Sequence, residues 1–454
     1  MSGISIFMIK MRNILCLMLL AVMAAGGWLR AGLLSADPAG QKLKPIKEPK
    51  VDLAAPSPWV CGVWLHPGQF GREKEAAAEK IRQTLDAYAA AGINSLFMMV
   101  KSTSGHVYFE SDLGVKDPAY NWDFFGLFLE EARKRKMEVH PWFCVFTEGA
   151  LPGRVREHPE WLVVGPGREM VRSVNPALPE VRAYEISLML ELAQKYRVDW
   201  IHLDYIRFPC EPTEPYFSYD GRTRQLFREE TGLDFNALKA RDSGNPYWNV
   251  WLEWNRKQVT KFVQELRAEL EKTGRRVRIS AAVFPDADNA RVLIGQDWAA
   301  WARKGLVDML NPMLYTNDLA LFEELTRRAV AVAEEKEASS GPTAIAAIAP
   351  HKVSPAAGSQ NISAGQSPLP ALTRTGASDT QAIKTGIPST ASARKVLVCP
   401  GVGIVTSHNQ ATPEIMLEEI RIARKLGADG VVFFSGGSLK EDFLTALAAV
   451  KVKK

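Results

Sequence analysis

One stretch decides the fold of this chain: residues 198–209, which read VDWIHLDYIRFP. Its first half is apolar enough for a buried strand, and Pro209 should end that strand because proline cannot donate a ladder hydrogen bond. Side chains alternate along a strand, so His202 and Asp204 should share one face, with Tyr205 and Arg207 on the other. Barrel enzymes keep their chemistry at the carboxyl ends of their strands. The stretch therefore predicts a catalytic Asp204; the alternative is a structural pair of Asp204 with Arg207.

Seven further apolar runs resemble strands, and segments with helical periodicity separate them. Pro179, for example, suits the first turn of a long helix before the central strand. This alternation predicts a (β/α)8 TIM barrel, with strands one to six in residues 59–335 and strands seven and eight in residues 395–452. An open doubly wound sheet is disfavoured, because no glycine-rich phosphate loop follows the first strand. The eight expected strands lie at residues 60–66, 94–101, 138–146, 198–209, 277–284, 307–315, 396–405 and 430–435.

Three segments lie outside the expected barrel. Lys10 and Arg12 precede an apolar run from residue 14 to residue 29, so residues 1–36 are interpreted as a signal peptide or an N-terminal anchor. Residues 37–58 are rich in proline and lysine and are expected to be a linker. Residues 336–394 are rich in Ala, Ser, Thr, Gly and Pro and predict a disordered insertion. The protein is therefore expected in the periplasm, the cell envelope or the extracellular space, with membrane contact only through an uncleaved anchor.

The composition is that of a globular protein, with 46% hydrophobic and 24% charged residues. The formal net charge is +5, and Lys10, Arg12 and Arg30 contribute part of it. The remainder is too small for a nucleic-acid footprint, so no nucleic-acid partner is expected. No CxxC pair is present, and neither a metal nor a cofactor is predicted.

The expected strand ends deliver carboxylates ringed by aromatic, imidazole and amide groups, a combination that suits a carbohydrate pocket. Asp204 is the first catalytic carboxylate that we expect, Asp286 the preferred second and Glu148 the reserve. The alternative for Asp286 is turn chemistry, because Phe284-Pro285-Asp286 is also a good turn start. The expected substrate-binding residues are Trp64, His66, Lys101, His106, Trp142, His202, Tyr205, Arg207, Tyr315 and Asn317.

A set of motifs along the chain resembles the family 10 glycosyl-hydrolase-like proteins, formerly called DUF187. The resemblance implies a TIM-barrel glycoside hydrolase, with some members acting on peptidoglycan glycan strands, and it places the family's acidic position of strand four on Asp204. The chain is thus expected to be an exported glycoside hydrolase that cleaves a polysaccharide or a peptidoglycan strand with paired carboxylates. The motifs are WVCGVW at residues 59–64, EVHPWF at 138–143, HPEWL at 158–162, NP at 175–176 with PEVR at 179–182, and HLDYIRFP at 202–209.

Two other functions remain open. A metal-dependent barrel hydrolase would use His66, His202, Asp204 and Asp286, although the first strand lacks the H-x-H pair that such sites favour. A non-catalytic glycan-binding barrel would bind sugar without turnover.

Export can be tested directly. Residues 1–40, fused to a reporter that is active only outside the cytoplasm, should give reporter activity, because a charged start followed by an apolar run directs secretion. A silent reporter would contradict the predicted signal.

Overall fold

The computed structural model describes residues 59–210, 215–235, 245, 247–335 and 395–452. The signal or anchor predicted for residues 1–36, the linker at 37–58 and the insertion at 336–394 lie outside these ranges. All that follows concerns the described residues.

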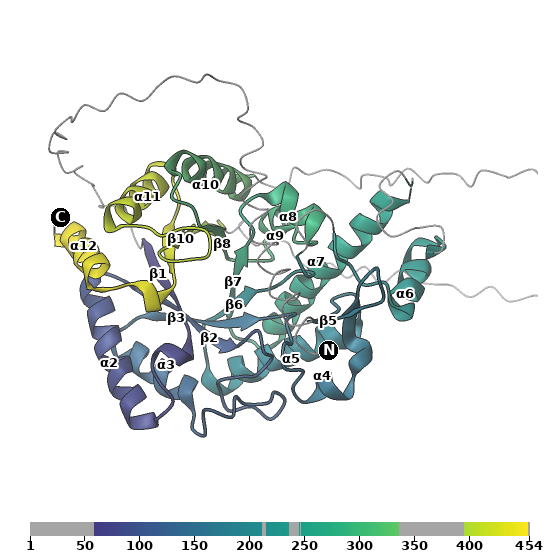
Figure 1. Cartoon of the computed structure of the whole chain (residues 1–454), viewed down its shortest axis with the longest axis horizontal. Coiled ribbons are helices and arrows are strands. Elements are labelled where there is room, and N and C mark those ends of the chain that lie inside the picture. The colour runs from purple at the N-terminus through teal and green to yellow at the C-terminus, as the bar shows by residue number, and fades with distance from the viewer. Residues whose placement is uncertain (1–58, 211–214, 236–244, 246, 336–394, 453–454) are drawn as a thin grey trace, which may run out of the picture. The chain divides into compact units, whose positions relative to one another are not determined.

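Parallel strands form a closed barrel, so the predicted TIM-barrel fold is confirmed (Figure 1). The last strand pairs with the first, Val60 opposite Gly430, and the chain of pairings closes between β8 and β10. The barrel strands are β1 (Val60–Leu65), β2 (Ser95–Lys101), β3 (Glu138–Cys144), β6 (Trp200–Asp204), β7 (Arg278–Val283), β8 (Met309–Leu314), β9 (Leu397–Val398), β10 (Gly401–Gly403) and β11 (Gly430–Phe434).

The predicted seventh strand is split into β9 and β10, which pair with β8 in one continuous register. The break lies at Pro400, and Pro312 occurs in the neighbouring β8, so neither proline donates a ladder hydrogen bond. The Asn311 side chain compensates by donating from Nδ2 to the Cys399 carbonyl at 3.0 Å.

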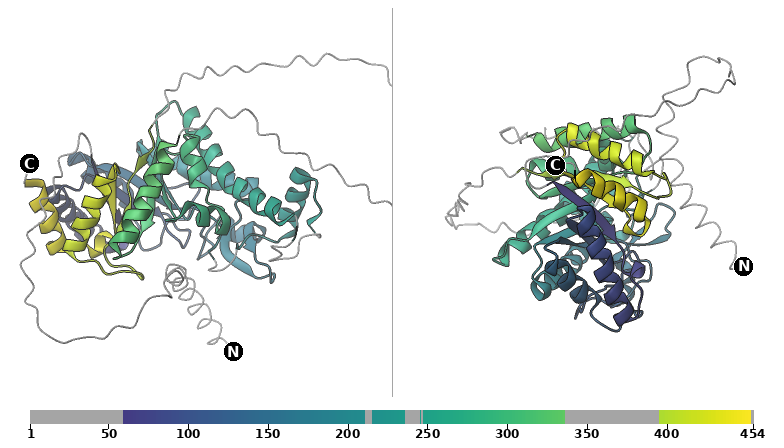
Figure 2. Two further views of the ribbon diagram at one scale, coloured as in Figure 1. Left: turned by 90° about the horizontal axis from the view of Figure 1, so that it is seen from above. Right: turned by 90° about the vertical axis from the view of Figure 1, so that its left-hand side faces the viewer.

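The outer helices begin and end where local chemistry directs. Helix α2 ends at Gly92, whose φ of 89° is left-handed, and the Asp318 side chain caps α10. Neighbouring helices α10, α11 and α12 pack side by side outside the strands (Figures 1 and 2). The helices are α2 (Lys74–Ala91), α3 (Phe124–Lys134), α5 (Pro179–Tyr196), α7 (Trp248–Lys272), α8 (Ala287–Leu293), α9 (Trp298–Arg303), α10 (Leu319–Glu334), α11 (Pro413–Lys425) and α12 (Glu441–Val452).

Several short elements in the loops were not predicted from sequence. Loops after β3 and β6 contain α4 (Arg154–Glu157), the hairpin β4 (Leu162–Val164) and β5 (Met170–Val174), and α6 (Gly221–Thr231). The four residues of α4, three of β4 and five of β5 are too few for a clear periodic pattern, whereas α6 has 11 residues and was missed. Single 3-10 turns lie at Pro67–Gln69, Pro159–Trp161 and Gly436–Ser438.

The barrel interior is filled by stacked side chains, so it is a packed core and no pore. The Arg278 guanidinium lies 3.9 Å from the centre of the Trp200 ring at the amino ends of the strands. The His140 ring stacks on Trp200 at 4.2 Å and on Phe97 at 4.1 Å, which continues the column toward the carboxyl ends. A second apolar layer lies between the strands and the outer helices.

Arg182, in the PEVR motif, ties the start of α5 to α7. It is 2% exposed, and it donates from Nε to Glu265 Oε2 at 2.8 Å and from NH1 to the carbonyls of Pro176 and Ala177 at 3.0 and 3.1 Å. This motif residue therefore serves the scaffold.

Replacing Arg182 by methionine should lower the free energy of unfolding by about 2–4 kcal/mol, because buried carbonyls and Glu265 lose their donor. Denaturant melts would measure the loss. The control is Arg327→Met, which removes a half-exposed guanidinium that pairs with Glu323 along α10 and should leave stability unchanged. Equal losses in the two variants would refute a scaffold role for Arg182.

Candidate active site

Asp204 is the last residue of β6, and its carboxylate is fixed by three donors. Oδ1 accepts hydrogen bonds from the Tyr205 amide at 2.6 Å and from Arg207 NH1 at 3.2 Å. Oδ2 accepts one from Trp142 Nε1, on neighbouring β3, at 3.2 Å. Asp204 is 6% exposed, so these contacts are made almost out of water.

The prediction that Arg207 faces away from Asp204 was wrong. The strand ends at Asp204 instead of continuing to Pro209, and Tyr205 has a left-handed φ of 50°. This turn brings Arg207 back to Asp204, and its guanidinium lies 4.3 Å from the Tyr205 ring centre and 4.9 Å from that of Phe284. A bulky residue in this conformation is strained, and such strain concentrates at functional sites.

Aromatic and imidazole rings surround Asp204. The His66 ring meets Trp142 edge-on at 5.0 Å, and Tyr315 stacks on Phe434 at 5.2 Å. Burial, assisted by the charge of Asp204, raises the pKa of Tyr205 to about 12 and raises that of Tyr315 well above its ordinary value. Burial lowers the pKa of His66, and Asp204 opposes that shift. Near neutral pH the site therefore combines one carboxylate and one guanidinium with uncharged rings.

Trp64 and His202 were expected to bind substrate, and the structure corrects this expectation. They are 1% and 0% exposed, and Trp64 Nε1 donates to His202 Nε2 at 3.0 Å. Because an indole N–H can only donate, His202 is neutral with its proton on Nδ1, 2.9 Å from Ser280 Oγ. Burial lowers the pKa of His202 to about 3. The pair forms a floor inside the barrel, and His202 has no free nitrogen for a metal.

Lys101 and Glu148 are also buried, at 0% and 1% exposure. Lys101 Nζ lies 2.7 Å from Glu148 Oε1 and 3.0 Å from Glu185 Oε1 on α5. A substrate cannot touch side chains enclosed in this way. The predictions of Lys101 as a substrate-binding residue and of Glu148 as the reserve catalytic carboxylate are therefore corrected.

The contacts of Asp286 agree with the alternative prediction that it starts a turn. Its Oδ1 caps α8 by accepting from the Asn289 amide at 2.8 Å, and its Oδ2 lies 3.3 Å from Arg328 NH1 on outer helix α10. None of the contacts described for Asp286 involves Asp204 or the rings around it. The described contacts of Asp286 are thus with α8 and α10, and its pairing with Asp204 stays a prediction.

His106 and Asn317 lie on rim loops. His106 Nδ1 is 3.0 Å from Ser104 Oγ, and exposed Asn317 donates from Nδ2 to the Gln410 carbonyl at 2.8 Å. Their role in binding substrate remains a prediction. Phe434 was not predicted as a site residue, although an aromatic residue at the end of the last strand was a usable signal.

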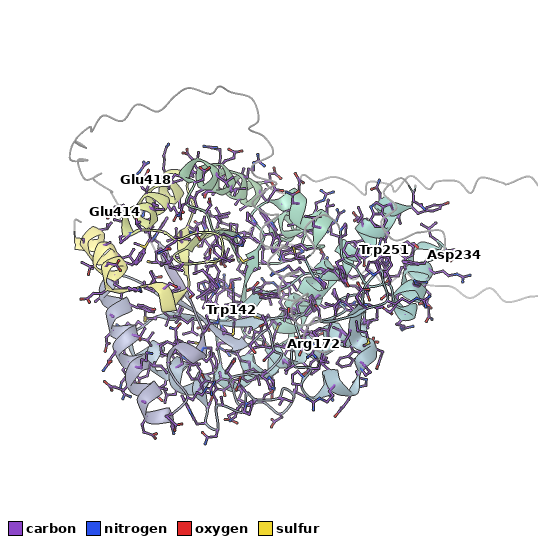
Figure 3. The ribbon with its side chains drawn as sticks, in the orientation of Figure 1. Trp142, Arg172, Asp234, Trp251, Glu414 and Glu418 are labelled. Carbon is purple, nitrogen blue, oxygen red and sulfur yellow. The ribbon has the colours of Figure 1, made fainter. Side chains whose placement is uncertain are left out.

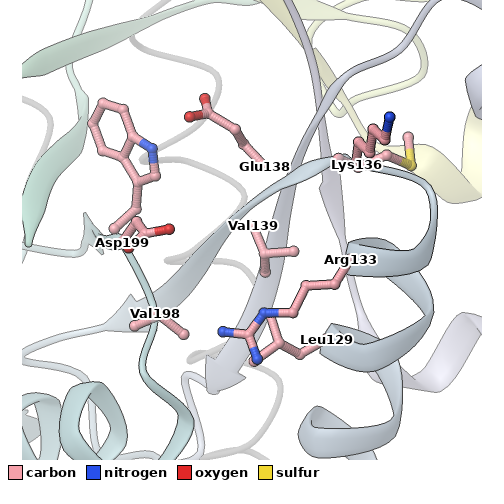
Figure 4. Close-up of a pocket in the computed structure, with 9 residues that line it drawn as sticks. Leu129, Arg133, Lys136, Glu138, Val139, Val198 and Asp199 are labelled. Carbon is pink, nitrogen blue, oxygen red and sulfur yellow. The ribbon is translucent and has the colours of Figure 1, made fainter.

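The candidate site lies at the carboxyl ends of the strands. Figure 3 places Trp142 among the strands and Glu414 and Glu418 on outer helix α11. A separate cavity of about 250 Å³ opens beside the amino ends of β3 and β6, where Glu138, Asp199 and Trp200 help to line it (Figure 4).

In the described part of the chain, no three His, Cys, Asp or Glu side chains are grouped to hold a metal ion. No helix there is long and apolar enough to cross a membrane.

Residues 60–360 match the glycosyl hydrolase-like 10 family. Glycosyl hydrolase YngK of Bacillus subtilis (strain 168) is 21% identical over 294 residues, which are 57% of this chain and 53% of YngK. Glycosyl hydrolase DigH of Escherichia coli (strain K12) is 23% identical over 268 residues, which are 51% of this chain and 56% of DigH. The chain thus spans about half the length of these curated relatives.

Solved structures share the fold at low sequence identity. The glycoside hydrolase domain of PgaB (BpsB) from Bordetella bronchiseptica has a TM-score of 0.59 and 13% identity, covering 87% of this chain and 99% of that domain. The GH42 β-galactosidase Gan42B from G. stearothermophilus has a TM-score of 0.54 and 10% identity, and the match covers 87% of this chain and 56% of the Gan42B chain. At such low identity these likenesses show the fold alone. The family match, over residues 60–360, extends over more than half of the chain. The chain belongs to the glycosyl hydrolase-like 10 family.

Proposed function

We propose that this protein is an exported glycoside hydrolase that cleaves a polysaccharide or a peptidoglycan glycan strand, with Asp204 as a catalytic carboxylate. The observation that carries the proposal is the fixed carboxylate at the end of β6, within a ring of Trp142, His66, Tyr205 and Tyr315. Family membership supports the reaction class. The names of YngK and DigH, both glycosyl hydrolases, agree with it.

The hydrogen bonds of Asp204 indicate which of its oxygens reacts. Each carboxylate oxygen has two acceptor sites. Oδ1 uses both, for the Tyr205 amide and Arg207, whereas Oδ2 receives only the Trp142 indole among the described contacts. Three donors and no acceptor fit the ionised form, which a nucleophile or a base needs. We therefore assign Oδ2 of Asp204 to attack the sugar carbon or activate water.

The rings around Asp204 support a sugar as the ligand. Aromatic faces such as those of Tyr315 and Phe434 match the C–H faces of pyranose rings, while the tyrosine hydroxyls and His66 offer hydrogen bonds to sugar hydroxyls. Glycoside cleavage also needs a proton donor for the leaving oxygen. Neither Asp286 nor Glu148 has that role in this proposal, because the first caps α8 and the second is buried with Lys101.

Replacing Asp204 by asparagine should lower kcat about 1,000-fold or more, because the isostere keeps the volume and loses the charge. Release of reducing ends from peptidoglycan strands and from soluble polysaccharides would measure turnover. Glycan affinity and melting temperature should change little. Unchanged turnover would rule out Asp204; sugar affinity without any turnover in the parent protein would favour the glycan-binding alternative.

Replacing Asp286 by asparagine is the matched control. Asparagine still caps a helix, and the lost contact is a partly exposed ion pair with Arg328 that contributes at most about 1 kcal/mol. Turnover should stay within about twofold of the parent value, since the side chain is engaged outside the site. A collapse of kcat in this variant, with the fold intact, would instead restore the predicted pairing of Asp204 with Asp286.

A further inference from the structure

A buried charge cluster lies beside β3 and is not used in the proposed chemistry. It consists of Lys101 at the end of β2, Glu148 in the loop after β3 and Glu185 on α5, each at most 1% exposed. Lys101 Nζ lies 2.7 Å from Glu148 Oε1 and 3.0 Å from Glu185 Oε1. Three charged groups from three elements are therefore joined out of contact with water.

Lys101 also holds the end of β3. Its ammonium donates to the Val145 carbonyl at 2.7 Å and approaches the Cys144 carbonyl at 3.3 Å. The amide of the same Val145 donates to the Asp204 carbonyl at 2.8 Å. Trp142, three residues earlier, donates to the Asp204 carboxylate. The end of β3 thus holds both the backbone and the side chain of Asp204, and Lys101 holds the end of β3.

The cluster has an imbalance of charge. One ammonium and two carboxylates leave a net negative charge, and an uncompensated buried charge is costly. The second oxygens, Oε2 of Glu148 and Oε2 of Glu185, are buried without a hydrogen-bond partner among the described residues. One proton on Glu185 removes the imbalance and can be shared with Glu148, whose carboxyl group lies within hydrogen-bonding reach.

The electrostatics of the cluster agree with this arrangement. Burial, with a contribution from Glu148, raises the pKa of Glu185 to about 8, against the opposing effect of Lys101. Burial alone would lower the pKa of Lys101, but the two carboxyl groups raise it above its ordinary value. The other titratable neighbours, Tyr184 on α5 and Cys144 on β3, also have raised pKa values and stay uncharged near neutral pH. The charge of Arg154 on α4 opposes the rise in the pKa of Tyr184.

We propose that Lys101 is a positioning residue for Asp204, acting through the Val145 carbonyl, and that the Lys101–Glu148–Glu185 cluster holds the end of β3 only while it retains one proton. This inference rests on the proposed role of Asp204. It assigns a function to two residues, Lys101 and Glu148, that cannot reach a substrate.

Amide hydrogen exchange tests the first half without any need for turnover. In full-length Lys101→Met, the Val145 and Tyr205 amides should exchange about tenfold faster or more. The Val145 amide donates from the end of β3 to the Asp204 carbonyl, and the Tyr205 amide donates to the Asp204 carboxylate that Trp142 of β3 orients. Amides of α11 should keep their protection. The matched control is Lys116→Met, which breaks a partly exposed pair with Glu110 and should leave both reporter amides unchanged.

Glu185→Gln tests whether the cluster must retain one proton, and it leaves the Lys101 ammonium in place. Glutamine mimics the protonated acid, so the charge at position 185 no longer changes with pH. Because burial raises the pKa of Glu185 to about 8, the rise from pH 7 to pH 9 crosses the range in which the wild type loses this proton. Protection of the Val145 and Tyr205 amides, corrected for intrinsic exchange, should fall between pH 7 and 9 in the wild type and stay flat in Glu185→Gln. The kcat of the two proteins should follow the same two patterns.

The sign of the stability effect follows from the raised pKa. The contribution of Glu185 is complete below its unfolded value of 4.5 and is lost as the pH rises through about 8. Burial also raises the pKa of Glu419, to about 9, so this residue too makes the protein less stable as the pH rises. Its contribution is the same in the wild type and in Glu185→Gln, so it cancels when the two are compared.

Two results would overturn the inference: unchanged reporter amides in Lys101→Met, or an alkaline loss in Glu185→Gln equal to that of the wild type. Either result would leave the role of Asp204 standing if Asp204→Asn abolishes turnover. If Asp204→Asn stays active while the protection of the Val145 and Tyr205 amides still depends on pH, the proposed function is refuted. The coupling of the cluster to β3 would then stand without it.

Discussion

The proposed catalytic site depends on the turn that begins at Asp204. Because Tyr205 adopts a left-handed conformation directly after the strand, its own amide and the Arg207 guanidinium both point back to Oδ1. The carboxylate is thereby held by the backbone, by a cation and by an indole from β3. A catalytic group gains most when its donors are in place before substrate arrives, since no reorganisation is then needed during reaction.

The rigidity of this arrangement comes from the barrel interior beneath it. The column of Arg278, Trp200, His140 and Phe97 fills the lower part, and the Trp64–His202 hydrogen bond forms the floor of the site. Stacked rings and a neutral imidazole with both nitrogens engaged leave little freedom for the strands to shift. The buried Lys101 cluster has the same effect from outside the strands.

The sequence predicted the barrel because every strand is an apolar run between helical periods. It predicted Asp204 for the same reason, since a lone carboxylate at the end of such a run is rarely buried without a purpose. Depth along a strand was harder to read: Trp64 and His202 alternate correctly into the barrel but lie too deep to reach a substrate. Lys101 was misread because the β2–β3 register shifts between Met99 and Lys101, and tertiary contacts with α5 then decide its direction. For Asp286 both interpretations fitted the local sequence, and the structure shows the contacts of the turn interpretation, a cap on α8 and an ion pair with Arg328 on α10.

A crystal structure of the protein with a bound glycan fragment tests the central claim most directly. The account predicts a sugar ring beside Tyr315 and Phe434, with its anomeric carbon about 3–3.5 Å from Oδ2 of Asp204, the distance of a near-attack geometry. A fragment bound only in the cavity beside Trp200 at the amino ends of the strands, with no contact to Asp204, would contradict it.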